Sequence, residues 1–177
     1  MEKDSPFVEL IKNGNLQEIQ DFYNNNPGID ISADDEYAFS CACGYGLLEV
    51  AKWLLEVKPD LDVSVVNGRP FCWACEEGHL ELAKWLLEVK PEFDISAENE
   101  CLFCCVCAQG HLHIAQWLLE VKPDIDITAG NNIAFIYACR YRNPDVALWL
   151  TTLEPRYVVV IEKEVILDYY VVKSNNA

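Results

Sequence analysis

The sequence predicts an all-α solenoid of stacked helix-turn-helix units with hairpin loops, and three observations predict it. First, the segment Leu48–Pro59 recurs almost unchanged as Leu80–Pro91 and Leu112–Pro123, which gives a period of 32 residues. Second, prolines and tryptophans keep this period in more divergent copies. Third, each copy is apolar on nearly every side, so only stacking on its neighbours can bury it. The periodic residues are Pro27, Pro59, Pro91, Pro123 and Pro155, with Trp53, Trp85, Trp117 and Trp149.

The period divides the chain into five repeats and a shorter end. We expect a single domain over 1–177, with repeats at about 5–36, 37–68, 69–100, 101–132 and 133–164. Ser5 can cap the first helix, with Pro6 at its favoured first position. Residues 165–173 lie in register with a sixth first helix, which predicts a partial C-terminal cap.

Two helices are expected in each repeat. In the third repeat, Pro70–Glu77 is a short apolar stretch closed by Gly78, a residue that readily adopts the left-handed conformation at a helix end. The polar residues of Leu80–Val89 recur three and four apart, which indicates a second helix with a narrow solvated stripe. Pro91 then ends this helix. About ten residues of extended arm with a polar tip follow in each repeat.

This order of helix, Gly-His turn, helix and extended hairpin resembles the ankyrin repeat. The resemblance covers about 5–155 and is carried by Gly78-His79-Leu80-Glu81, Gly110-His111-Leu112, the Leu-Leu pairs and Pro70. The recurring motif Trp-Leu-Leu-Glu-Val-Lys-Pro also resembles ankyrin arrays encoded by large DNA viruses of protists. Two departures stand out: the period is one residue shorter than the usual 33 or so, and a lysine replaces the family's helix-ending glycine. These lysines are Lys58, Lys90 and Lys122.

Composition limits the partners that the chain can take. The formal net charge is −16 and the isoelectric point is about 4.4, so a phosphate backbone or an anionic membrane would be repelled. No apolar run is long enough for a secretory signal or a membrane helix. We therefore expect that the chain binds neither nucleic acid nor membrane. We also expect it to be a monomer. Its expected location is cytoplasmic, in the host cytoplasm if the chain is viral, with the nucleus as the alternative.

Nine cysteines raise the question of a metal site. Cys72-x-x-Cys75 and Cys104-x-x-Cys107 would each suggest half of a zinc site if met alone. However, one cysteine recurs every 32 residues, which predicts a buried ladder whose members lie about one repeat thickness apart, too far for a tetrahedral zinc. The ladder consists of Cys43, Cys75, Cys107 and Cys139, with Cys101 and Cys105 as outliers. No metal or cofactor is expected, and a metal or redox protein is the less favoured alternative.

Residues suited to catalysis are few, and the repeat accounts for them. His79 and His111 occupy the Gly-His turn, where a ring can bond backbone between repeats, and His113 lies on the polar stripe. Ser32, Ser64 and Ser96 share one register in the arms. Because neither a general base nor a glycine-rich phosphate loop is apparent, we do not expect an enzyme.

Arm tips and outward positions of the first helices remain as a docking surface. The resemblance implies that partners dock on this concave face, where the copies also differ most, although drift of solvated residues would give the same variation. The candidate protein-binding residues are Asp34, Asp35, Glu36, Tyr37, Tyr45, Val66, Asn67, Arg69, Trp73, Glu76, Glu77, Glu98, Asn99, Glu100, Gln109, Asn131, Asn132, Tyr137, Arg140 and Tyr141.

Three aromatic residues of this set, Trp73, Tyr45 and Tyr141, are the expected hot spots. The carboxylates in the set predict a protein partner with a basic surface. The expected function is a protein-protein interaction module, and the alternative is a substrate-adaptor subunit of a ubiquitin ligase or another assembly.

Overall fold

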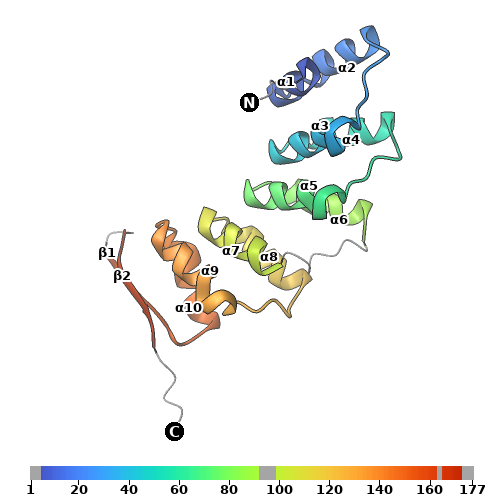
Figure 1. Ribbon diagram of the computed structural model, residues 1–177. Helices are drawn as coiled ribbons and strands as arrows, with labels where there is room; N and C mark the ends of the chain where they lie inside the picture. Colours follow the sequence, from blue (N-terminus) through green and yellow to red (C-terminus); the bar gives the residue numbers. More distant parts are fainter. Residues whose placement is uncertain (1–4, 92–98, 163–164, 173–177) are drawn as a thin grey trace. The chain divides into compact units, whose positions relative to one another are not determined.

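The computed structural model describes residues 5–91, 99–162 and 165–172. Within these ranges the side chains of Asp35, Asn67, Asn99, Glu100, Val165 and Leu167 are not described. Each repeat has a first helix followed by a second (Figure 1). The first helices are α1 (Pro6–Asn13), α3 (Ala33–Gly44), α5 (Val65–Glu76), α7 (Asn99–Gln109) and α9 (Ala129–Arg140). The second helices are α2 (Leu16–Asn25), α4 (Leu48–Val57), α6 (Leu80–Val89), α8 (Leu112–Val121) and α10 (Pro144–Leu153).

The helices belong to two compact units, residues 1–97 with α1 to α6 and residues 98–177 with α7 to α10. Inside each unit, every first helix packs beside the next first helix, and helix pairs of one repeat pack on each other. The predicted stack of helix-turn-helix pairs is therefore confirmed. The single domain over 1–177 stays a prediction.

A phenylalanine on each first helix supplies the core. Phe7 is 4% exposed and its four copies, each 32 residues further on, are at most 1% exposed. These copies are Phe39, Phe71, Phe103 and Phe135. On the second helices the recurring alanines, such as Ala51, are fully buried as expected, whereas the recurring tryptophans are only half-buried. The tryptophan ladder thus borders the core that the phenylalanines fill.

The two helices of a repeat are joined by the same tight turn from the second repeat to the fifth. The Leu47 N–H donates to the Ala42 carbonyl at 2.9 Å and the Gly46 N–H to the Cys43 carbonyl at 3.1 Å, the pattern of a Schellman helix end. The turn needs a left-handed residue, as the sequence predicted for Gly78. Three of these repeats place glycine there, but in the last one Arg142 takes this conformation with a φ of 62°.

Arg142→Gly should therefore stabilise the protein. A non-glycine residue in the left-handed region costs about 1 kcal/mol, so we expect the free energy of unfolding to rise by about that amount. Urea unfolding followed by circular dichroism measures it. The matched control is Arg140→Gly, at the last residue of helix α9, where glycine should lower stability. Equal effects of the two substitutions would contradict the prediction.

The arms between repeats are held by short polar turns. The Asp62 carboxylate accepts hydrogen bonds from the Ser64 N–H at 2.9 Å and the Ser64 hydroxyl at 2.6 Å. Asp126 and Thr128 repeat this turn in the fourth repeat. These bonds lower the pKa of both carboxyl groups. Lys90 donates to the Ser64 hydroxyl at 2.5 Å. Ser64 therefore has the architectural role expected from its register.

Tips of the arms contain left-handed residues that sequence patterns did not predict. Asp34, Glu36, Val66, Asn131 and Asn132 all have positive φ. In the third repeat, α5 begins at Val65, earlier than the predicted start at Pro70. Its regular helical part begins only after the left-handed residues Val66 and Gly68. Each described tip is thus a compact turn that presents polar and apolar side chains at the start of a first helix.

A β-hairpin follows α10, with its first strand inside the predicted fifth repeat, and it shows that the helix predicted at 165–173 is wrong. Strands β1 (Tyr157–Glu162) and β2 (Val165–Val171) pair antiparallel, with a bulge after Val160. Tyr170 occupies a position where earlier first helices carry the smaller residues Ala42, Ala74, Val106 and Ala138, and the segment is rich in β-branched and aromatic residues. The hairpin packs on α9 and α10, so it covers the end of the second unit as strands.

Candidate protein-docking surface

Every predicted docking residue whose side chain is described lies at the surface. The exposed ones are Asp34, Tyr45, Val66, Glu77, Gln109, Asn131, Arg140 and Tyr141. The half-buried ones are Glu36, Tyr37, Arg69, Trp73, Glu76, Asn132 and Tyr137. Glu98 lies outside the described residues, as do the side chains of Asp35, Asn67, Asn99 and Glu100. The structure brings Trp73 together with Tyr37 and Arg69 in the first unit, and Tyr137 together with Tyr141 in the second.

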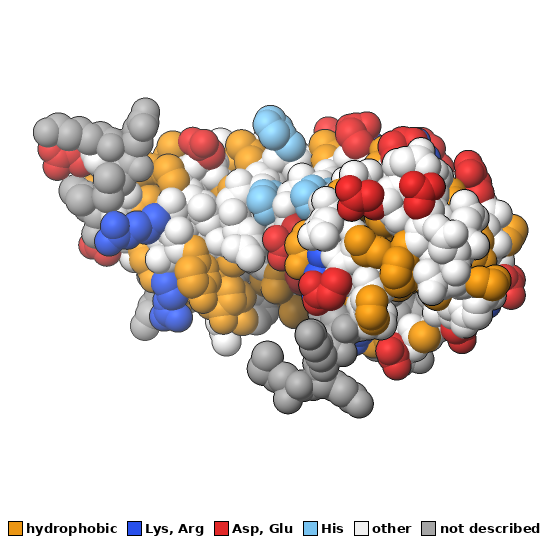
Figure 2. Space-filling view, turned by 90° about the horizontal axis from the view of Figure 1, so that it is seen from above, with side chains coloured by type: hydrophobic (Ala, Val, Ile, Leu, Met, Phe, Trp, Pro, Cys, Tyr) orange, Lys and Arg blue, Asp and Glu red, His pale blue; other side chains and the backbone are white. Residues whose placement is uncertain are grey.

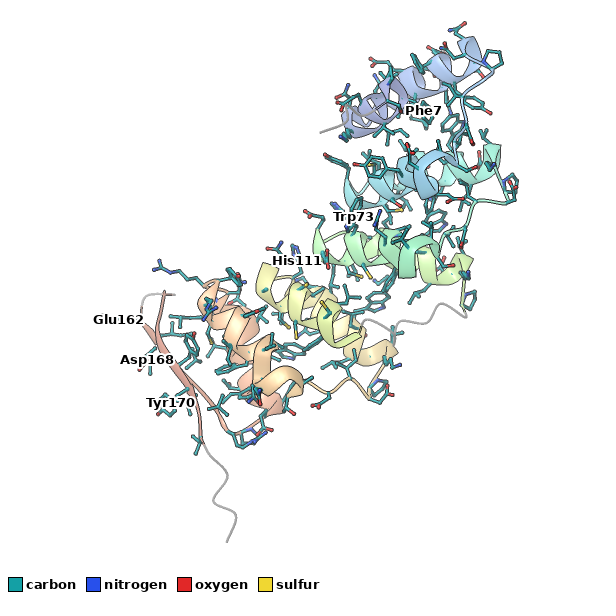
Figure 3. The ribbon with its side chains drawn as sticks, viewed as in Figure 1. Phe7, Trp73, His111, Glu162, Asp168 and Tyr170 are labelled. Carbon is teal, nitrogen blue, oxygen red and sulfur yellow. The ribbon has the colours of Figure 1, made fainter. Side chains whose placement is uncertain are left out.

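In the first unit the group is organised by Trp73. Its ring meets Tyr37 edge-on at 6.4 Å between centroids, and the Arg69 guanidinium lies 5.6 Å from the Trp73 ring. The indole also approaches Gly44 so closely that a Cβ there would lie 3.2 Å from the ring atom Cε3. Figure 3 shows Trp73 beside the preceding repeat. The predicted hot spot Trp73 therefore also joins the second and third repeats.

A shallow hollow lies next to this tryptophan. It has a volume of about 520 Å³ and is lined by Gly44, Tyr45, Trp73, Glu76, Glu77 and His79. His79 is fixed in place because its Nε2 lies 3.1 Å from the Gly44 carbonyl oxygen, which confirms the structural role expected for this histidine. Tyr45 is 54% exposed at the rim. The hollow combines aromatic surface with carboxylates and has no lysine or arginine in its lining.

In the second unit, the docking residues around Tyr137 and Tyr141 adjoin arginines and not carboxylates in the sequence. Tyr137 and Tyr141 meet edge-on at 5.7 Å, and Tyr141 is 59% exposed. Their neighbours in sequence, Arg140 and Arg142, are both exposed. Acidic side chains are spread over much of the face shown in Figure 2, with few basic ones among them.

Asn132, one of the predicted binding residues, also takes part in structure. Its amide oxygen accepts a hydrogen bond from the Tyr157 hydroxyl at 3.0 Å, so this side chain ties the fifth repeat to the hairpin. Sequence reasoning did not find this contact. The signal for it would have been a tyrosine after the last repeat's Pro155 together with an asparagine at a left-handed tip.

Asn143 replaces the turn histidine in the fifth repeat. Its side-chain amide donates to the Ala108 carbonyl at 2.6 Å, which is the counterpart of the contact that His79 makes. Asn143 lies 32 residues after His111, and this spacing was the available signal. In the third and fifth repeats, the side chain at this position therefore bonds to the backbone of the preceding repeat.

All nine cysteines lie in the described part of the chain and are thiols. The predicted ladder is confirmed, since its four members are at most 2% exposed. Burial raises the pKa of each ladder thiol, to about 12 for Cys139. Among the described residues, no group of three or more His, Cys, Asp or Glu could hold a metal ion.

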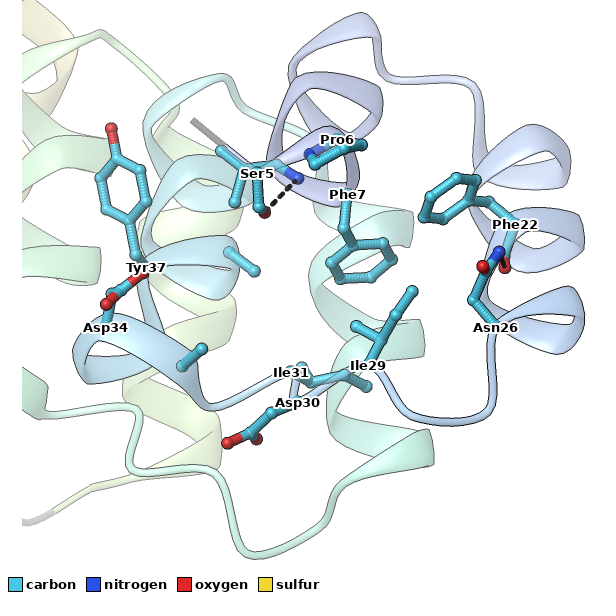
Figure 4. Close-up of a pocket in the computed structure, with 13 residues that line it drawn as sticks. Ser5, Pro6, Phe7, Phe22, Asn26, Ile29, Asp30, Ile31, Asp34 and Tyr37 are labelled. Atoms are coloured by element: carbon cyan, nitrogen blue, oxygen red, sulfur yellow. Dashed lines mark hydrogen bonds between the residues drawn. The ribbon is translucent and has the colours of Figure 1, made fainter. Parts of the chain in front are cut away.

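An apolar pocket of about 310 Å³ lies at the first repeat (Figure 4). Phe7, Phe22 and Ile29 form its apolar wall, and Tyr37 stands on the opposite side. Ser5 caps α1 beside it by accepting a hydrogen bond from the Val8 N–H at 3.3 Å, as expected. Tyr37 is thus shared by this pocket and the Trp73 cluster.

Comparisons with known proteins agree with this repeat structure. A family model described as ankyrin repeats in three copies matches residues 7–99, and one described as ankyrin repeats in many copies matches residues 103–151. The crystal structure of the human ASB11 ankyrin repeat domain is similar in fold, with a TM-score of 0.65 and 21% identity over 85% of this chain and 70% of that one. No curated protein matches the sequence significantly. None of the described helices is long and apolar enough to cross a membrane.

Proposed function

Because the chain belongs to the ankyrin repeat family, we propose that it is a protein-binding module that docks a partner through its arm tips and first-helix surface. Ankyrin repeats generally mediate protein-protein interaction. In this proposal the chain is a binder without catalytic activity. It works as a monomer in the cytoplasm or nucleus, reducing compartments that suit nine thiols.

One observation carries the proposal: the two most exposed large apolar side chains of the described residues are Tyr45 and Tyr141. They occupy the same position of different repeats, just after a first helix. Each stands beside an aromatic cluster, that of Trp73 or that of Tyr137. Exposed tyrosines on a rigid scaffold concentrate binding energy at low entropic cost.

Partner chemistry follows from the charges around these tyrosines. Asp34 lines the pocket that Tyr37 also lines, and Glu76 and Glu77 line the hollow beside Trp73. In the second unit, Arg140 and Arg142 adjoin Tyr141 in the sequence. The proposed partner therefore has a basic region for the first unit and an acidic or neutral region for the second. Electrostatic steering of this kind weakens as salt rises.

The Tyr45→Ala, Tyr141→Ala double variant tests the docking surface. We expect proteins captured from a cell lysate by the immobilised wild type to bind the variant at least about tenfold more weakly, because each tyrosine contributes about 1 kcal/mol or more. Trp73 is left intact because it packs between repeats. Affinities are measured by surface plasmon resonance with the captured protein.

The matched control is Val89→Ala with Val121→Ala, two apolar side chains that are 43% and 44% exposed at the ends of second helices. The control should keep the wild-type affinity. If the tyrosine variant binds as well as this control, the proposed docking surface is wrong.

A further inference from the structure

The hollow beside Trp73 lies between the second and third repeats. Gly44 lies in its lining, and the described copies of this position in the later repeats are Glu76, Ala108 and Arg140. Because Gly44 has no side chain, Trp73 lies against the backbone there and the surface is hollowed between Tyr45 and the end of α5. A side chain of a partner can therefore enter at this place.

Its lining favours a positive charge. Trp73 and Tyr45 offer aromatic surface, and the faces of such rings attract cations. Glu77, which is exposed, and Glu76 place carboxylates in the same lining. An apolar side chain would remove water from these carboxylates without replacing their hydrogen bonds, and an acidic one would be repelled.

Within the protein itself, a cationic side chain already lies close to the Trp73 ring. Arg69, one helical turn earlier in α5, holds its guanidinium 5.6 Å from the Trp73 ring, yet Arg69 is not part of the lining of the hollow. The equivalent end of α9 carries Arg140 beside Tyr141. The preference for a cation thus belongs to the first unit.

We propose that this hollow binds a lysine or arginine side chain presented by the protein partner. The inference rests on the proposed docking function and specifies what that partner offers to the first unit. The cation lies against the Trp73 and Tyr45 rings and pairs with Glu77. Its alkyl stem covers the remaining apolar lining.

N-acetyl-arginine methylamide is the probe, with the citrulline derivative as its neutral isostere. Titration is followed by the NMR signals of the Trp73 indole N–H and the Tyr45 ring. We expect both to shift with the arginine compound, and the citrulline compound to bind about fivefold more weakly because one exposed charge pair is lost. Equal binding of the two compounds, or no shift at Trp73, would overturn the proposal.

Glu77→Gln should weaken arginine binding by about the same factor. Glu88→Gln, which removes an exposed carboxylate on α6, is the matched control and should leave binding unchanged. Circular dichroism verifies that both variants are folded. If captured proteins depend on Tyr141 while Glu77→Gln changes neither their affinity nor that of the arginine probe, the docking function stands and this inference fails.

Discussion

Gly46→Ala is expected to lower the free energy of unfolding by about 3 kcal/mol. Gly46 has a φ of 69°, which an alanine adopts only at a cost. An added Cβ would also lie 2.4 to 2.7 Å from three atoms of the His79 ring. That ring is held by its contact with the Gly44 carbonyl oxygen, so moving it breaks a link between two repeats.

Two other glycines supply a graded control for Gly46. An added Cβ at Gly14 would meet the end of the flexible Leu47 side chain at 2.8 Å, so we expect a smaller loss of about 1 to 2 kcal/mol. Nothing lies within 4 Å of a Cβ at Gly28, so Gly28→Ala should change stability by less than about 0.5 kcal/mol. Urea unfolding measures all three. A loss at Gly46 no larger than at Gly14, which shares the positive φ, would contradict the role of the histidine contact.

Much of the fold could be predicted because the repeat constrains it strongly. The period of 32 residues located the helix pairs, the left-handed turn at Gly78 and the buried cysteines. Stacking explains this success, since an internal repeat can bury its apolar faces only against copies in the same register. Local sequence and tertiary packing then favour the same structure.

The repeat spacing predicted the wrong structure where the local residues favour a different one. The segment after the last repeat has the right spacing for another helix, but Tyr170 is too large for a position that holds alanine or valine in the earlier repeats. The β-branched and aromatic residues of the segment favour strands. The left-handed tips were missed as well, because Val66 is a residue that seldom adopts positive φ.

The docking surface could be predicted as a set of positions, and all of those described are accessible. The role of each residue could be assigned only from the geometry of its side chain. Trp73 stood out in the sequence as the tryptophan outside the ladder, but only its contacts with Tyr37 and Gly44 show that it also joins repeats. The spacing of residues cannot show which of two neighbouring repeats a side chain contacts.

Tyr157→Ala is expected to lower the free energy of unfolding by about 4 kcal/mol, the cost of removing a buried aromatic ring. Tyr157 is 3% exposed and stacks on Phe135, with ring centroids 4.2 Å apart and the planes within 7° of parallel. Its loss uncovers a core phenylalanine of the fifth repeat. Urea unfolding gives the size of the effect, and hydrogen exchange of the β1 amides shows whether the hairpin detaches first.

Tyr170 provides the matched control on the same hairpin. It is 52% exposed and lies on the side of the strands away from the helices (Figure 3). Tyr170→Ala should change stability by less than about 0.5 kcal/mol. If the two substitutions have equal effects, the hairpin does not act as the cover of the second unit.

Tyr157→Phe isolates the hydroxyl group and adds a pH dependence. At neutral pH we expect a loss of about 1 to 2 kcal/mol, because the Asn132 amide oxygen loses its donor. Burial, with a smaller contribution from Glu154, raises the pKa of Tyr157 to about 12, whereas an unfolded tyrosine has a pKa of about 10.

The stabilisation from the Tyr157 hydroxyl is therefore complete below about pH 10 and is lost as pH rises toward 12, since only the unfolded chain ionises in that range. Phenylalanine has no such ionisation, and the cysteines and lysines titrate alike in both proteins. The difference in unfolding free energy between wild type and Tyr157→Phe should consequently narrow as pH increases through this range. A difference that stays constant or widens would mean that the phenol is not held protonated against α9.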